Sequence, residues 1–220
     1  MYRQQSLITL DQFYEMKPLS KLEAILSFID YSLFEEVFPY DAHRRGPKGY
    51  SKKQLFTTLM AMPVEQLSDI KALVTRLKSD PVLRRSLGYD YTNDTPSAAT
   101  LNRFITLLSG TDILERTFRR MVCKARKLGL IAGTNVAIDA SKLTAYEHAV
   151  PKSRIPPDNP SFPNWGGKLD TNGNFIKWFG WKMHALVDTY SGIPISYIIT
   201  PANIADMDVA ENLIQKMMDD

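Results

Sequence analysis

Apolar residues recur every three or four positions through the first 130 residues, the spacing of one face of an α-helix. Ser51 and Ser97 precede two of these stretches as candidate N-caps, and Asp80-Pro81 interrupts the chain after a third. Gly129 follows the last as a candidate C-cap. We predict an all-helical domain over residues 1–130. Its clearest apolar stripes lie in residues 22–29, 55–62, 70–77, 101–108 and 114–125.

The pattern changes after Gly133. Short runs of β-branched and aromatic residues replace the helical spacing, and a stretch rich in Pro and Gly separates the first run from the others. The final residues return to helical spacing, with Val209 and Leu213 on the apolar face. We predict a second domain over residues 131–220, giving an α+β chain. In order it holds a buried strand at 135–139, a long loop at 141–174, two strands at 175–187 and 193–199 joined by a turn at 188–192, and a helix from 206.

Composition narrows the class of protein. The chain has 220 residues, of which 44% are hydrophobic and 23% charged, as in ordinary globular proteins. One cysteine excludes an internal disulfide framework, and three histidines leave little for a His/Cys zinc site. We interpret Cys123 as a buried helix residue. With no membrane-length apolar run and no signal-like N-terminus, the expected location is cytoplasmic.

Charge is divided unevenly along the chain. Residues 1–130 hold 20 Lys and Arg against 14 Asp and Glu, whereas residues 131–220 hold 7 against 10. A basic first domain beside an acidic second one is typical of a nucleic-acid binder joined to a carboxylate active site. Chance variation over segments of this length gives similar imbalances, so charge alone does not decide the matter.

Asp139 is the first candidate for chemistry. It ends the predicted strand and is followed by a loop, where a carboxylate can hold a divalent cation at a sheet edge. The alternative is that Asp139 only caps the turn at Ser141.

Several motifs in a fixed order extend this picture. In the second domain they are residues 137–141 (AIDAS), 180–188 (GWKMHALVD) and 200–206 (TPANIAD). In the first they are Gly46-Pro47 before a helix, residues 87–89 (LGY), and Pro96-Ser97 with residues 100–104 (TLNRF). Together they resemble the DDE transposases of bacterial insertion sequences over roughly residues 30–215.

The resemblance implies a fold and a catalytic site. The second domain would be the first half of a ribonuclease-H-like α/β core, with Asp139 as the first of three catalytic carboxylates. The family's second Asp and its Glu lie further along the chain than Asp220, so we expect an incomplete catalytic domain that is inactive alone. Asp188 and Asp206 are the candidates to substitute for a missing carboxylate. The alternatives are that Asp188 only belongs to the hairpin turn and that Asp206 caps the final helix. The implied cofactor is Mg²⁺, with Mn²⁺ as the alternative, once the carboxylate set is complete.

Basic residues supply candidate DNA contacts. Phosphates require positive charge but little else, so the basic stripe of the helix at 114–127 is sufficient for contact with them. The alternative is that this stripe is only a solvated helix face. Arg103 lies on the helix capped by Ser97. Lys182 and His184 lie on the same face of one predicted strand. This face could reach the phosphate backbone, and the alternative is a polar strand face that is only exposed to solvent. The three tryptophans are interpreted as packing residues. The full set of candidate DNA contacts is Arg44, Arg45, Lys48, Arg103, Arg116, Arg119, Arg120, Lys124, Lys127, Lys182 and His184.

The sequence therefore predicts a DNA transposase that binds, cleaves and transfers the ends of a mobile element. Its partners would be double-stranded DNA at the terminal repeats and a second copy or a full-length transposase. It would be nucleoid-associated when bound to DNA. A non-catalytic DNA-binding remnant, an inhibitor of the full-length enzyme, and a relic without function are the alternatives.

Overall fold

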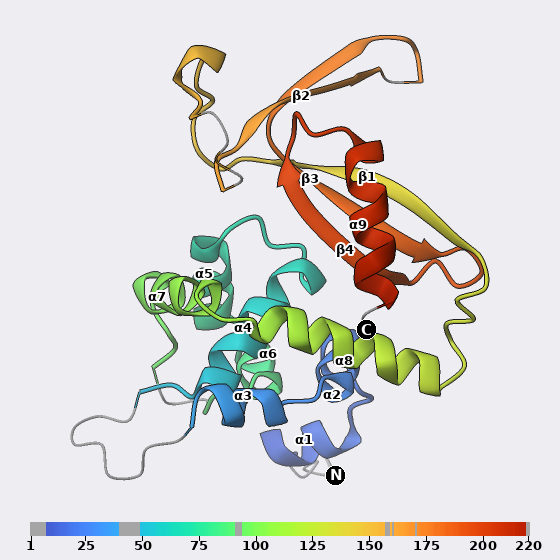
Figure 1. Ribbon diagram of the computed structural model, residues 1–220. Coiled ribbons are helices and arrows are strands. Elements are labelled where there is room, and N and C mark those ends of the chain that lie inside the picture. The colour runs from blue at the N-terminus through green and yellow to red at the C-terminus, as the bar shows by residue number, and fades with distance from the viewer. Residues whose placement is uncertain are drawn as a thin grey trace, which may run out of the picture. The chain divides into compact units, whose positions relative to one another are not determined.

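The computed structural model describes residues 8–39, 49–90, 94–156, 159, 161–169 and 171–218. They form two compact units, residues 1–121 and 122–220 (Figure 1). Within the described residues, no helix is of the length and apolar character that crossing a membrane requires. The domain boundary expected at residue 130 stays a prediction.

The first unit is helical around one apolar core. Leu33, Leu73, Leu77 and Leu101 are completely buried in it, and the rings of Phe34 and Phe56 lie 4.5 Å apart. The stripes at 22–29, 55–62, 70–77 and 101–108 therefore contribute to the core that the spacing predicts, whereas Leu114 of the last stripe is exposed. The helices are α1 (Leu10–Met16), α2 (Lys21–Phe28), α3 (Ser32–Val37), α4 (Lys52–Val64), α5 (Ile70–Ser79), α6 (Pro81–Ser86), α7 (Ala98–Ser109) and α8 (Ile113–Lys127), which runs on into the second unit.

Local capping defines several helix boundaries. The side chains of Ser51 and Ser97 accept hydrogen bonds from the backbone N–H groups three residues ahead, so both predicted caps are confirmed. Asp80 caps α6, with Pro81 at its first position. Gly129 follows α8 with φ +71°, the left-handed conformation expected of a C-terminal glycine.

The second unit is a four-stranded antiparallel sheet with one long helix on it. Its central strand, β3, pairs with β1 along one edge and with β2 and then β4 along the other. Figure 1 shows α9, in red, lying over the sheet, where it buries Val209 and Leu213. The elements are β1 (Val136–Thr144), the short 3-10 helix η1 (Lys152–Arg154), β2 (Asn164–Leu169), β3 (Phe175–Asp188), β4 (Pro194–Pro201) and α9 (Asp206–Met218).

The structure confirms the turn between β3 and β4 and corrects two expectations nearby. β1 does not end at Asp139 but continues to Thr144, and it is largely exposed rather than buried. Part of the expected loop at 141–174 is strand β2. The extension of β1 and the formation of β2 have the same cause. Strand β3 is 14 residues long, so its backbone N–H and C=O groups can pair with β1 beyond Asp139 and with β2.

Cys123 is exposed on α8, not buried as expected. Its neighbours Val122 and Ala125 occupy the buried positions of that turn. Since successive helix residues are about 100° apart, Cys123 faces away from them.

Candidate functional site

Asp139 is the fourth residue of β1 and carries an exposed carboxylate. One of its oxygens accepts a hydrogen bond from the N–H of Ala140, at 2.8 Å. Asp139 lies opposite Ala185 of β3, whereas Ala140 lies opposite His184. Because side chains alternate across a strand, Asp139 points to the sheet face opposite the one that holds His184.

The residues around Asp139 do not form a complete metal site by themselves. In the described parts of the chain, no three His, Cys, Asp or Glu side chains come together in a way that could hold a metal ion. A single carboxylate binds Mg²⁺ weakly unless substrate phosphates contribute ligands. The described residues therefore do not by themselves supply the ligands of a two-metal site.

Asp188 does not substitute for a missing carboxylate. It pairs with Val136, three residues before Asp139, which places it about 10 Å along the sheet. Its buried carboxylate accepts hydrogen bonds from the N–H and hydroxyl of Ser191, at 2.9 and 2.7 Å, and from the N–H of Gly133, at 2.9 Å. These hydrogen bonds, above all the one from the Ser191 hydroxyl, hold the pKa of Asp188 below its ordinary value. Asp188 is a structural group that ties the start of β1 to the β3–β4 turn.

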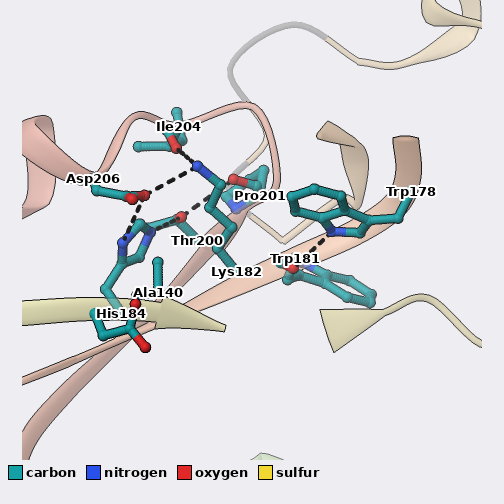
Figure 2. A network of polar contacts seen from close by, with 10 residues as sticks. Ala140, Trp178, Trp181, Lys182, His184, Thr200, Pro201, Ile204 and Asp206 are labelled. Carbon is teal, nitrogen blue, oxygen red and sulfur yellow. Dashed lines mark hydrogen bonds and ion pairs between the residues drawn. The ribbon is translucent and has the colours of Figure 1, made fainter. Parts of the chain in front are cut away.

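Asp206 is also engaged elsewhere, in a polar network on the face that α9 covers (Figure 2). Its Oδ1 atom lies 3.0 Å from Nζ of Lys182 and 3.5 Å from Nδ1 of His184. The Lys182 ammonium also donates to the carbonyl of Ile204 at 3.0 Å, and Nε2 of His184 is 2.9 Å from the Thr200 hydroxyl. The network joins β3, β4 and the first turn of α9.

His184 is completely buried, so the sequence alternative of a solvent-exposed histidine is wrong. Burial holds its pKa below the ordinary value, and the charge of Lys182 acts in the same direction. The carboxylate of Asp206 opposes that shift. The sequence correctly placed Lys182 and His184 on one face but did not reveal Asp206 as their common partner, since α9 brings it there from more than 20 residues away.

Arginines of α8 form ion pairs within the helical unit. Arg116 lies 2.7 Å from Glu36, Arg119 3.4 Å from Glu115, and Arg120 2.6 Å from Asp30. Arg120 also donates to the Ser32 hydroxyl at 2.6 Å. Arg116 and Arg120 therefore connect α8 to α3 and the residues just before it.

The other candidate DNA contacts are more scattered. Lys124 and Lys127 lie in the last turn of α8, and Arg103 on α7 donates to the carbonyl of Ala99. Three candidates lie outside the described residues: Arg44, Arg45 and Lys48.

The tryptophans pack at the base of the β2–β3 hairpin. Trp178 is 7% exposed, and its indole N–H donates to the carbonyl of Trp181 at 3.3 Å. The Trp165 indole donates to the carbonyl of Val150, and its ring lies 5.5 Å from that of Phe179. The packing interpretation is confirmed for Trp178.

Comparison with known families agrees with this arrangement. Residues 9–107 match a family model described as a transposase domain, DUF772, and residues 133–219 match one described as a transposase DDE domain. No match was found among curated proteins or solved structures. The two models cover the helical unit and the sheet in the order that the sequence motifs indicate. The chain belongs to the insertion-sequence DDE transposases.

Proposed function

We propose that this transposase binds double-stranded DNA at transposon ends and takes part in strand cleavage and strand transfer, with Asp139 as the first catalytic carboxylate. The observation that carries the proposal is the exposed Asp139 side chain on β1, inside the region that matches the transposase DDE domain. It is held on a paired strand, and a rigid support suits a group that must position a reacting phosphate.

Divalent metal ions are typical of the family, and we propose Mg²⁺, with Mn²⁺ as the alternative. When bound, the metal would activate water and stabilise the leaving oxygen of the phosphodiester. Asp139 would contribute one ligand to it. Further carboxylates must complete the set, since Asp188 and Asp206 are engaged in other contacts.

DNA binding is assigned to positive charge in both units. The candidates at the end of α8, Lys124 and Lys127, would contact phosphates without reading sequence. Lys182 and His184 are better explained as structural residues, because both take part in the network around Asp206. Association with a second transposase molecule, either another copy or a full-length enzyme, would bring two ends together.

Two assays with one substitution test the proposal. A labelled duplex from the DNA that flanks the coding sequence is mixed with the protein in Mg²⁺, and both binding and strand cleavage are followed. The D139N variant should bind the duplex as well as the wild type does, and any cleavage that the wild type shows should be lost. D208N, which removes an exposed carboxylate from α9, is the matched control and should leave binding and cleavage unchanged.

Each result has one interpretation. Absence of binding by the wild type at low salt would overturn the proposal. Binding without cleavage by the wild type would favour a binding-only protein, an alternative that the engaged positions of Asp188 and Asp206 support. Equal cleavage by wild type and D139N would remove Asp139 from the catalytic set.

A further inference from the structure

A two-stranded ribbon extends from the sheet of the second unit. We call residues 164–180 the arm: β2, the turn after it, and the first part of β3. Residues 175–179 of β3 pair with β2 alone, because the pairing with β1 and β4 starts at Gly180 and Trp181. In Figure 1 the arm, in orange, reaches beyond the part of the sheet that α9 covers.

The base of the arm is firmly packed. Trp178 is buried and lies against Gly166, where a β-carbon would come 2.7 Å from its ring. The ring of Trp165 packs against Phe179 on the other face of the ribbon. Aromatic packing on both faces gives the arm a rigid origin, so its outer residues are held in a defined direction.

The outer part presents large apolar side chains to solvent. Leu169 is 67% exposed and Phe175 is 59% exposed, and they lie directly opposite each other on one face. The Phe175 ring covers Gly167, where it would collide with any β-carbon. The ring thus lies over Gly167 while more than half of Phe175 stays exposed, and together with Leu169 it forms an exposed apolar pair.

Positive charge accompanies this apolar face. The Lys177 ammonium lies 5.7 Å from the centre of the Phe175 ring, and Lys168 is exposed on the opposite face of the ribbon. The sequence of the arm contains one acidic residue, Asp170, which lies outside the described residues. The arm therefore combines a net positive charge with exposed aromatic and aliphatic groups.

From these features we infer that the arm is a second DNA contact, a β-ribbon that docks on duplex DNA; the inference rests on the proposed function. The major groove of DNA admits a two-stranded ribbon, and lysine side chains beside it reach phosphates. Phe175 and Leu169 supply apolar contact to base edges or steps, as apolar side chains do in other DNA complexes. Basic charge beside the apolar face favours DNA over a protein partner.

The test measures DNA affinity of the full chain as a function of salt. The probe is a labelled duplex of about 30 base pairs, three helical turns, taken from the DNA that flanks the coding sequence. We expect F175A to weaken binding about tenfold without changing the salt dependence, because aromatic contacts to bases release no counterions. K177A should weaken binding and reduce the slope of log affinity against log salt by about 1.

Y190A is the control, since Tyr190 is an aromatic residue even more exposed than Phe175, at 91%, and lies at the β3–β4 turn. Its affinity for the duplex should equal that of the wild type. Thermal melting of each variant checks that the fold is retained, as expected for exposed side chains.

The outcomes separate the arm from the rest of the proposal. Wild-type binding that F175A and K177A leave unchanged would overturn the arm as a DNA contact while the proposed function stands. A wild type that binds no DNA would overturn the proposed function itself. If F175A changed the oligomeric state of the protein in solution and left its DNA affinity intact, the arm would be an interface between protein chains.

Discussion

The Nδ1 atom of the fully buried His184 lies 3.5 Å from the Oδ1 atom of Asp206, and no hydrogen-bond partner within the described residues serves that nitrogen. The imidazole is thus held near a carboxylate without a formed hydrogen bond to it, while Nε2 is occupied by Thr200. Protonation would place a charge in a buried site that Lys182 also makes positive. The network is therefore built around a neutral histidine.

This arrangement predicts a dependence of stability on pH. Since the folded pKa of His184 is lower than that of the unfolded chain, about 6.5, the unfolded chain binds the proton more readily. The contribution of neutral His184 to the free energy of unfolding is therefore complete above about pH 6.5 and is lost as the pH falls through the pKa of the folded state. Denaturant unfolding between pH 8 and 5 measures it.

His184→Gln is the variant that isolates the effect. Glutamine can keep a hydrogen bond to Thr200 but does not titrate, so its stability should fall less between pH 7 and 5. At pH 7.5 we expect it to lose about 1 kcal/mol through imperfect replacement of that hydrogen bond. An equal fall with pH in the variant and the wild type would show that another group is responsible.

The lowered pKa of Asp188 predicts a second loss of stability in acid, at a lower pH than the loss that His184 causes. Its pKa is lowered by hydrogen bonds from Ser191 and Gly133, so the folded chain binds a proton less readily than the unfolded one. This contribution is complete above about pH 3.9 and is lost as the pH falls through the folded pKa. Asp188→Asn should lower the melting temperature at pH 7 and reduce the further loss below pH 4. Unchanged melting at pH 7 would contradict the structural role.

Local signals explain which parts of the fold the sequence could predict. Ser51 and Ser97 cap their helices through groups three residues away, and Val209 and Leu213 lie on one face by helical spacing alone. The turn after Asp188 is equally local. Each of these features depends on neighbours in sequence, and each appears in the structure as expected.

Long-range packing explains what the sequence could not predict. Gly166 and Gly167 favour a loop by composition, yet both lie in strand β2. Glycine is required at these positions because the rings of Trp178 and Phe175 leave no room for a β-carbon. The partner of His184 arrives on α9, and that of Arg120 lies 90 residues earlier in the chain. Neither contact has a signal in the spacing of nearby residues.

The basic residues of α8 are expected to differ in their effect on DNA binding. The Arg120 guanidinium already contacts Asp30 and Ser32, so a phosphate must compete with those groups. Lys127 lies in the last turn of α8. Lys127→Ala should reduce the slope of log affinity against log salt by about 1, and Arg120→Ala by less.

Asp30→Asn completes this comparison. If Arg120 reaches phosphate once its partner is removed, this variant should bind DNA more tightly than the wild type at low salt. A larger change of slope for Arg120→Ala than for Lys127→Ala would contradict the expected order of the two residues and would show that the ion pair opens on binding.

Gly180 of β3 lies where β1, β2 and β3 meet, and a larger side chain does not fit there. It pairs with Thr144 of β1 and Asn164 of β2, and its φ is +155°. A β-carbon there would collide with the carbonyl oxygen of Leu143 and lie 2.6 Å from the backbone nitrogen of Ala145. Both obstacles are backbone atoms of the β1 edge, so relief requires moving the strand that carries Asp139.

Gly180→Ala should therefore lower the free energy of unfolding by about 3 kcal/mol, from backbone strain and overpacking together. Gly192→Ala is the control, because its φ is +70° but no atom outside its neighbours lies within 4 Å of a β-carbon. Its cost should be only about 1 kcal/mol, the strain of the left-handed conformation. Urea unfolding of both variants measures the difference in the free energy of unfolding. Equal losses would contradict the prediction and would mean that β1 moves aside at Gly180 without an energetic penalty.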